Sequence, residues 1–487
     1  MNDRKEKSGQ RMRLVYDAVV EGIARREWKP GDKLPSVRIQ SERLKVHRLT
    51  VLKAYRKLKD EGIIEVKYKS GYFVCRVPAA VPTPGAGIPD DRLHWDYGVH
   101  KSTVNRNRAM EFQSQSVEYQ MSKALIDPKL LPNRYLSNHV RQVFDIYPKV
   151  LSTYSDVMGD LELREAMAGY FLQKHGIVAG ADEMMVTTGA QQAIDLVSRS
   201  LVKPGDTVLI ETPTYGPAIE LFRQQNAKLI PIPISQEGYD LDRVEQIMNR
   251  HRPRLFYVNP TFHNPTGFTV PSPQRKRLVE LAESYQCILV EDDINHDIYF
   301  ECVPPPPLFF YDTEGYVVYI RSFSKYVAPG LRVAFLTARP PVMNCLVPMK
   351  ALTDHGSPLL GQKIFQHYFF SDRLQAHIAK LRTALQLRKE KMEAQLAGTG
   401  WQWASPKGGL NLWIRLPEEI TAESLLERCL NRSVAFLPGA ICDPLGLLNN
   451  RIRLSYSFIN EPQLEEGIKR LIAAADTLKG IDNTRGT

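Results

Sequence analysis

The stretch RSFSKYVAPGLR, residues 321–332, decides how the rest of this 487-residue chain is interpreted. It follows an apolar run, residues 316–320, and places Lys325 just after two serines and seven residues before an arginine. A lysine can form an imine with an aldehyde, while serine hydroxyls and an arginine fork can hold a phosphate. The stretch therefore suits a phosphorylated aldehyde. A basic surface loop after a buried strand is the alternative.

Length and composition exclude several classes of protein. The chain is long enough for two or more domains, and its 43% hydrophobic and 24% charged residues are ordinary for a soluble protein. The six cysteines form no C-x-x-C pair, which argues against a disulfide framework or a zinc site. No secretory signal and no apolar run of 18 residues is visible, so we expect a cytoplasmic protein with no membrane partner and no metal.

The positive charge is concentrated at the amino end. Residues 1–76 contain 20 Lys or Arg against 10 Asp or Glu, whereas residues 77–487 contain 44 of each kind. All of the formal excess therefore lies in one small segment, which indicates a polyanion as its partner. A solvated basic face is the alternative.

This basic segment has the pattern of three helices followed by a hairpin. Helical spacing runs over residues 14–28, Ser36 can cap a second helix over residues 37–44, and a third helix is predicted over residues 47–60. Two short strands are predicted within residues 63–74. The order is that of a winged helix-turn-helix, in which the third helix enters the major groove and the wing lies along the backbone.

Three motifs in this segment, LPSVR (34–38), VHRLTV (46–51) and SGYFV (70–74), closely resemble the GntR-type DNA-binding domain, over residues 11 to 75. The resemblance implies that double-stranded DNA is contacted by Arg38, Arg48, Thr50, Lys53, Lys69, Ser70 and Gly71. Lys45 and His47 replace the family's usual glycine and serine. We expect each replacement to lower the local stability by up to about 1 kcal/mol.

Beyond this domain the periodic pattern stops. Residues 78–89 are rich in proline and glycine, which favours a semi-extended chain. We interpret residues 77–113 as an interdomain linker. For residues 90–112, an ordered excursion over the following domain is the alternative.

From about residue 114 onward, helical stretches alternate with short apolar runs. The runs are residues 184–187, 207–210, 228–232, 255–258, 287–290, 317–320 and 333–336. This alternation predicts an α/β domain with a mostly parallel sheet that is covered on both faces. Ligands of such sheets bind at the carboxyl ends of the strands.

Polar and aromatic residues follow several of these runs. TGAQQ (188–192) opens a helix with no acidic residue in its first turn, which suits an anion. Tyr215 follows the second run, and Asn264 lies in a loop after the run 255–258. The acidic triplet 291–293 ends a buried strand, where carboxylates need a partner such as a pyridinium nitrogen or a metal.

Together these motifs resemble the fold-type I aminotransferase family, which uses pyridoxal 5′-phosphate (PLP), over about residues 115–478. The resemblance implies a large α/β domain, a smaller C-terminal α/β subdomain and a homodimer. It also implies that Lys325 carries the Schiff base, that Asp292 pairs with the ring nitrogen, and that Arg453 binds the α-carboxylate of an amino acid.

The same resemblance implies the remaining cofactor contacts. Asn264 would reach the ring 3-hydroxyl and Tyr215 would stack on the ring. The phosphate would be held by Ser322, Ser324, Arg332, Gly189, Ala190, Gln191 and, across the dimer interface, Tyr154. Ile294 and Asn295 stand where the family generally has a tyrosine bonded to the 3-hydroxyl, so we expect altered tuning of the imine and poor turnover.

A GntR-like domain (residues 1–76) that is linked through residues 77–113 to an aminotransferase-like domain (residues 114–487) resembles the MocR-type regulators. The resemblance implies a PLP-dependent transcription regulator that senses an amine or amino acid through aldimine exchange at Lys325. A catalytically active aminotransferase with a fused DNA-binding domain is the second hypothesis. A silent large domain that serves only for dimerisation is the third.

Overall fold

The computed structural model describes residues 2–25, 27–60, 63–67, 71–75 and 116–482. The chain divides into two compact units, Met1–Gly98 and Val99–Thr487. The linker predicted for residues 77–113 lies outside the described residues. None of the described helices is long and apolar enough to cross a membrane.

The first unit contains three helices and an antiparallel hairpin. Its elements are α1 (Asn2–Ala24), α2 (Val37–Arg43), α3 (Arg48–Asp60), β1 (Ile64–Lys67) and β2 (Gly71–Val74). Val15 and Val19 of α1 are fully buried against Val51 and Tyr55 of α3, and the hairpin closes this small core. The order of elements is the winged helix-turn-helix predicted from the sequence.

The ends of α2 and α3 are stabilised by different side chains. The Ser36 hydroxyl accepts a hydrogen bond from the Ile39 amide at 3.3 Å, as predicted for the cap of α2. At the start of α3, Nδ1 of His47 accepts a hydrogen bond from the Leu49 amide at 3.3 Å. The histidine therefore satisfies one free amide of this helix, as a serine cap would. Lys45 has a φ of 50°, a left-handed conformation that costs a non-glycine residue energy.

The second unit is built on a seven-stranded sheet with the strand order β4-β10-β9-β8-β7-β5-β6. The strands are β4 (Met184–Thr187), β5 (Thr207–Thr212), β6 (Lys228–Pro233), β7 (Leu255–Val258), β8 (Ile288–Asp293), β9 (Val317–Ser322) and β10 (Ala334–Thr337). All neighbouring pairs from β9 to β6 are parallel, which confirms the mostly parallel sheet.

Strand β10 is the exception, because it runs antiparallel to both β9 and β4. Only the stretch 323–333 connects β9 to β10, and a parallel return needs a crossover of a dozen residues or more. Ala334 faces Ser322 on one side and Thr187 on the other. The lysine-bearing stretch is therefore held at the same sheet edge as the loop that follows β4.

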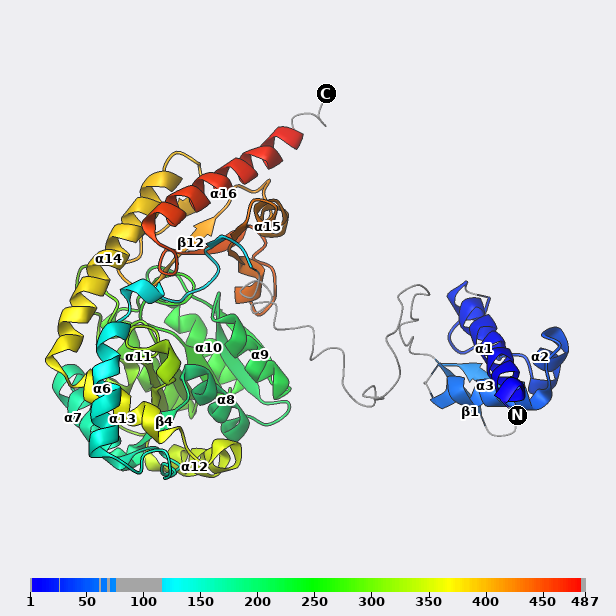
Figure 1. The fold of residues 1–487 in the computed structure, drawn as a ribbon, viewed down its shortest axis with the longest axis horizontal. Coiled ribbons are helices and arrows are strands. Elements are labelled where there is room, and N and C mark those ends of the chain that lie inside the picture. The colour runs from blue at the N-terminus through cyan, green and yellow to red at the C-terminus, as the bar shows by residue number, and fades with distance from the viewer. Residues whose placement is uncertain (1, 26, 61–62, 68–70, 76–115, 483–487) are drawn as a thin grey trace. The chain divides into compact units, whose positions relative to one another are not determined.

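Helices cover both faces of this sheet (Figure 1). They are α6 (Asn133–Ile146), α7 (Leu161–His175), α8 (Ala190–Leu201), α9 (Gly216–Gln224), α10 (Leu241–His251), α11 (Ser272–Tyr285), α12 (Pro340–Asp354), α13 (Leu359–Phe369) and α14 (Asp372–Leu396). The apolar side chains of α8, α9 and α12 form one core on one face, and those of α7, α10, α11 and α13 join a larger core on the other. Both faces of the central strands are buried, which explains their continuous apolar runs.

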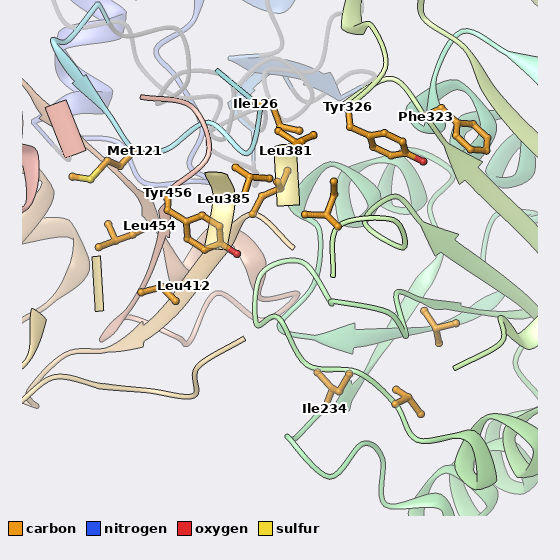
Figure 2. Close-up of a cluster of buried hydrophobic side chains, with 14 of the residues drawn as sticks. Met121, Ile126, Ile234, Phe323, Tyr326, Leu381, Leu385, Leu412, Leu454 and Tyr456 are labelled. Atoms are coloured by element: carbon orange, nitrogen blue, oxygen red, sulfur yellow. The ribbon is translucent and has the colours of Figure 1, made fainter. Parts of the chain in front are cut away.

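A smaller C-terminal part packs beside the large sheet. It contains the antiparallel sheet β11 (Gln402–Trp403), β12 (Asn411–Arg415), β15 (Arg451–Ser455) and β14 (Leu437–Pro438), with α15 (Ala422–Leu430) and α16 (Glu461–Asp482). A separate parallel pair joins β3 (Tyr119–Gln120) to β13 (Val434–Ala435). Figure 2 shows Met121 and Ile126, just after β3, in one apolar cluster with Leu385 of α14 and Leu454 of β15.

Candidate functional site

A cavity of about 180 Å³ lies at the carboxyl ends of the strands of the large sheet. It is lined by Leu125, Gly189, Ala190, Gln191, Tyr215, Asp292, Ile294, Ser322, Ser324, Lys325, Pro329 and Arg332. The loops after β4, β5, β8 and β9 thus bring together most of the residues proposed for the cofactor. Strands β8 and β9 are neighbours, β4 and β9 both pair with β10, and only β7 separates β5 from β8, so these loops lie at one edge of the sheet.

Lys325 lies in this cavity in an environment that disfavours its charged form. Burial, together with the positive charge of Arg453, lowers the pKa of its amine to about 8. The Asp292 carboxylate opposes this shift but does not cancel it. At pH 7 about one tenth of Lys325 is therefore an uncharged nucleophile, far more than for a lysine with an ordinary pKa.

Asp292 at the end of β8 is buried and only half satisfied. Its Oδ2 accepts the Tyr257 hydroxyl at 2.6 Å, whereas its Oδ1 is buried without a hydrogen-bond partner among the described side chains. Burial raises the pKa of this carboxyl to about 6, against the opposing effects of Tyr257 and Lys325. An unpaired buried oxygen is costly, so a cationic or N–H partner would stabilise this site.

The loop after β4, residues 188–190, forms a cradle together with Arg332. Gly189 has a φ of 98°, a conformation that L side chains rarely adopt, and a Cβ at this position would displace the Arg332 guanidinium. Nη2 of Arg332 donates to the Thr188 carbonyl at 2.8 Å, which fixes the guanidinium beside the loop. Helix α8 begins at Ala190 with no side-chain cap on its first amides. These amides and the guanidinium together suit an anion.

Arg453 on β15 is buried, with 3% of its surface exposed, at the other end of the site. Its Nη1 donates to Oδ1 of Asn264 at 3.0 Å, and its Nη2 donates to the Ser122 carbonyl at 2.5 Å. Asn264 is itself held by Oδ1 of Asn259, which accepts the Asn264 amide at 2.6 Å. The arginine is therefore fixed in direction, and a backbone carbonyl occupies part of its fork.

Four of the singled-out residues do not line the cavity: Asn264, Arg453, Tyr154 and Asn295. Tyr154 is 92% exposed. Asn295 turns its amide group toward the Phe262 carbonyl at 2.9 Å. At the positions where the family has its tyrosine, Ile294 therefore lines the cavity and Asn295 does not.

The structure adds site residues that the sequence did not indicate. Tyr257 lies within an apolar strand, where a tyrosine usually means packing, and it contacts Asp292 from the neighbouring strand. Ser122 acts through its backbone carbonyl, so its side chain carried no signal. Leu125 lines the cavity from a segment far from the motifs.

Beneath the cavity, a cluster of buried charges surrounds Arg321. Its Nη1 lies 3.2 Å from Oδ2 of Asp293, and its Nη2 lies 2.6 Å from Oδ2 of Asp297. His296 contacts the same Asp293 oxygen at 2.8 Å, and Tyr319 donates to it at 2.9 Å. Asp292 and Asp293 thus point to opposite sides of β8, and only Asp293 finds a cationic partner in the described residues.

The residues of the cavity fit PLP. The unpaired Oδ1 of Asp292 suits a protonated ring nitrogen, and the cradle at Gly189 with Arg332 suits the phosphate. Lys325 supplies an amine of lowered pKa between them. Within the described part of the chain, no group of three or more His, Cys, Asp or Glu side chains is placed to hold a metal ion.

The N-terminal unit presents a second candidate site, on α2 and α3. Arg48 and Lys53 are exposed on α3, Thr50 is half-buried there, and Arg38 is exposed on α2, where its Nε donates to Glu42 at 3.2 Å. Gly71 begins the second strand of the hairpin with a φ of 116°. Lys69 and Ser70, also proposed for DNA, lie outside the described residues.

Two family models match the chain. Residues 146–471 match aminotransferase class I and II, and residues 12–74 match the bacterial regulatory proteins of the gntR family. The first match covers most of the second unit, and the second covers the helices and hairpin of the first unit.

Individual relatives fall into two groups. The chain is 31% identical to the HTH-type transcriptional regulator YisV of Bacillus subtilis, over 96% of each chain. It is 35% identical to a 2-aminoadipate transaminase of Thermus thermophilus, over 73% of this chain and 88% of the transaminase. Among solved structures, the α-aminoadipate aminotransferase LysN of Thermus thermophilus is 31% identical. LysN matches with a TM-score of 0.74 over 80% of this chain and 100% of its own.

Proposed function

Because this chain belongs to the class I and II aminotransferases and, within the GntR family, to the MocR-type transcription regulators, we propose that it controls transcription in response to an amine or amino acid bound at Lys325. PLP is its cofactor, and the N-terminal unit is its DNA-binding domain. The observation that carries the proposal is the cavity in which Lys325, Asp292 and the cradle at Gly189 meet. We also propose that residues 77–113 tether the two domains and that the protein acts in the cytoplasm.

The chain's own groups divide the work at this cavity. PLP, when bound, supplies an aldehyde carbon that a primary amine can join and a ring that accepts electron density. Lys325 would hold the cofactor through its amine; an effector amine would take that place and pass a proton to the Lys325 nitrogen. Asp292 would keep a proton on the ring nitrogen, and Arg332 would hold the phosphate end.

The effector is proposed to carry a carboxylate as well as an amine. Arg453 is fixed by Asn264 and can offer its fork to a carboxylate, provided that the Ser122 carbonyl moves away from Nη2. Ser122 belongs to the segment 119–127, which lies near the start of the described part of the second unit, residues 116–482. Displacement of Ser122 is therefore a route by which effector binding reaches the tether and the DNA-binding domain.

One experiment tests this function directly. The purified protein is loaded with PLP and titrated with a panel of amino acids and amines, while the visible absorbance of the cofactor and the affinity for operator DNA are recorded together. We expect at least one ligand to change the absorbance and the DNA affinity over the same concentration range. A ligand that changes only the absorbance, with no effect on DNA across the whole panel, would contradict the regulatory role.

The rival function is efficient transamination, because aminotransferases are among the relatives. The absence of a tyrosine at positions 294 and 295 favours poor turnover, since no phenol is supplied there to the cofactor. Repeated production of keto acid in the presence of a second keto acid would support the enzyme instead.

Uptake of PLP by the cofactor-free protein is expected to become faster as the pH rises toward 8. The neutral amine of Lys325 attacks the aldehyde, and with a pKa of about 8 its population grows roughly tenfold per pH unit below that value. Above pH 8 the rate should level off. Stopped-flow absorbance measures this profile. A rate that keeps rising to pH 10, as for an exposed lysine, would show that the pKa is not lowered.

Replacing Arg453 by glutamine is expected to remove the preference for a carboxylate. In the unsubstituted protein, an amino acid should bind about tenfold to a hundredfold more tightly than the amine that lacks only its carboxylate. In Arg453→Gln the two ligands should bind alike, as measured by absorbance titration. Arg415→Gln serves as the control, because Arg415 is a half-buried arginine on the neighbouring strand β12 that pairs with Glu418. A preference that persists in Arg453→Gln would remove this residue from effector binding.

Arg48→Ala is expected to weaken operator binding by about tenfold to a hundredfold, because Arg48 is exposed at the start of α3. Fluorescence anisotropy with labelled operator DNA at fixed salt measures the loss. Arg25→Ala is the matched control, since Arg25 pairs with Glu21 in α1 and lies outside the proposed contact set. Equal losses in both variants would indicate a general charge effect instead of a specific contact.

A further inference from the structure

An ion pair between a buried lysine and a partly buried aspartate lies near the cradle at Gly189, outside the residues that line the cavity. Lys350 of α12 is fully buried, and its Nζ donates to both carboxylate oxygens of Asp354, at 2.7 and 2.8 Å. It also donates to the Ser357 hydroxyl at 3.3 Å, and that hydroxyl donates to the Val186 carbonyl of β4 at 3.1 Å. The pair is thus joined to the strand that leads into the cradle.

Asp354 is joined to the cradle itself through one side chain. Its Oδ2 accepts Nε2 of Gln192 at 2.7 Å, and Oε1 of the same glutamine accepts the Thr188 amide at 2.7 Å. Burial alone would raise the pKa of the Asp354 carboxyl, but the hydrogen bonds from Lys350 and Gln192 outweigh it and lower this pKa. Asp354 is therefore charged at neutral pH and accepts hydrogen bonds without donating any.

A charged carboxylate fixes which end of the Gln192 amide faces the loop. Only the NH₂ group can face Asp354 favourably, so the amide oxygen must face the Thr188 amide. With its N–H held by Gln192, and its carbonyl held by Arg332, Thr188 is fixed on both sides. Gly189 and the first amides of α8 follow directly, so their direction depends on this arrangement.

Stability is a poor explanation for such an ion pair. Removing a lysine from water costs several kcal/mol, and a buried pair often adds no net stability over apolar side chains of similar size. Burial lowers the pKa of Lys350, so the environment disfavours the charged form of this lysine. What the pair does provide is a fixed orientation for one glutamine beside the cradle.

We propose that Gln192, Asp354 and Lys350 are positioning residues for the cofactor phosphate, which hold the Thr188–Ala190 amides in the direction that an anion requires. This inference rests on the proposed binding of PLP, but it concerns only the phosphate end of the site. Lys325 and Asp292, at the other end, are not contacted by any of the three residues in the described structure.

The test compares PLP with pyridoxal, which has the same aldehyde and ring but no phosphate. Gln192→Leu cuts the link to the loop and leaves the Lys350–Asp354 pair in place. Absorbance titration of the cofactor-free protein should show PLP binding weakened by about tenfold, as for the loss of one hydrogen bond to the loop. Pyridoxal binding should change by less than about twofold on the same scale.

Two further variants make the result decisive. The double substitution Lys350→Met with Asp354→Leu removes both charges together, so that neither is left buried and unpaired, and it should reproduce the selective loss for PLP. Asp195→Asn is the control, because Asp195 lies on the same helix as Gln192 but pairs with Arg199 near the surface. It should leave both ligands unaffected.

The outcomes separate cleanly. Equal weakening of PLP and pyridoxal in Gln192→Leu would mean a general structural defect and would overturn the positioning role. Unchanged PLP binding in this variant would overturn it as well. If the unsubstituted protein bound neither ligand, the proposed PLP binding would fail; this is measured on the unsubstituted protein alone, so it is distinct from a failure of the positioning role.

Discussion

Lys325→Ala is expected to give a protein that folds and binds operator DNA but never holds the cofactor covalently. The amine of Lys325 lies in the cavity with a pKa of about 8, and alanine offers nothing that can join an aldehyde. After borohydride treatment with PLP, the unsubstituted protein should carry one label at position 325, and the variant should carry none there. Peptide mass spectrometry measures the label.

Lys325→Ala should also lose the response of its DNA affinity to the effector completely. Because we propose that an effector takes the place of Lys325, the DNA affinity of Lys325→Ala should no longer respond to any amine that shifts it in the unsubstituted protein. Lys276→Ala, an exposed lysine on α11, is the control and should keep the full response. A variant without Lys325 that still responds would show that the effector is sensed elsewhere.

Arg321→Leu is expected to destabilise the second unit by about 3–5 kcal/mol, the usual loss when one partner of a buried ion pair is removed. Arg321 is fully buried between Asp293 and Asp297, so its loss leaves two carboxylates without this cation. The shift of the urea midpoint of the second unit, followed by tryptophan fluorescence, measures the effect. Arg339→Leu is the control, because Arg339 and Glu183 are less completely buried, and it should cost no more than about 1 kcal/mol.

The pH dependence of this difference has a definite sign. Burial raises the pKa of Asp293 and Asp297, but neighbouring cations outweigh it, so both pKa values lie below the usual range. Their stabilisation is complete above about pH 4, the usual aspartate pKa, and is lost as the pH falls through the lowered values. The difference in the free energy of unfolding between Arg321→Leu and the unsubstituted protein should therefore become smaller below pH 4. A difference that is constant with pH would mean that packing, not charge, is lost.

Much of the fold was predictable because local patterns and tertiary structure agree. The runs at residues 184–187 and 255–258 are strands with the predicted limits, and the cap at Ser36 is present. The apolar pattern of the strands carries no sign of the reversal of β10, although the short connection from β9 already excludes a crossover. At the start of α3 a ring nitrogen of His47 accepts an amide, a contact that the sequence did not predict.

Site residues whose side chains are reactive or charged could be predicted from the sequence. Residues that reach the site only through strand register or through a backbone carbonyl could not. Lys325, Asp292 and Arg332 stood out as reactive or charged groups after buried strands, and the structure brings them to one cavity. Tyr257 depends on the register of β7 against β8, which no local pattern encodes. Ser122 uses a carbonyl that every residue has, at a distance of more than three hundred residues from Arg453.

The Ser122 carbonyl on Arg453 has a quantitative consequence for any signal that this protein reads. If Arg453 binds the effector carboxylate as proposed, that carboxylate replaces the Ser122 oxygen at Nη2. It then gains less binding free energy than it would at an unoccupied guanidinium, and half-saturation shifts to a higher concentration. A receptor that binds an abundant metabolite very tightly is always saturated, so its occupancy does not change when the metabolite concentration changes. Competition from the Ser122 carbonyl would set the effector concentration at half-saturation. Substitutions in the segment 119–127 would therefore raise or lower that concentration without changing the residues that bind the cofactor.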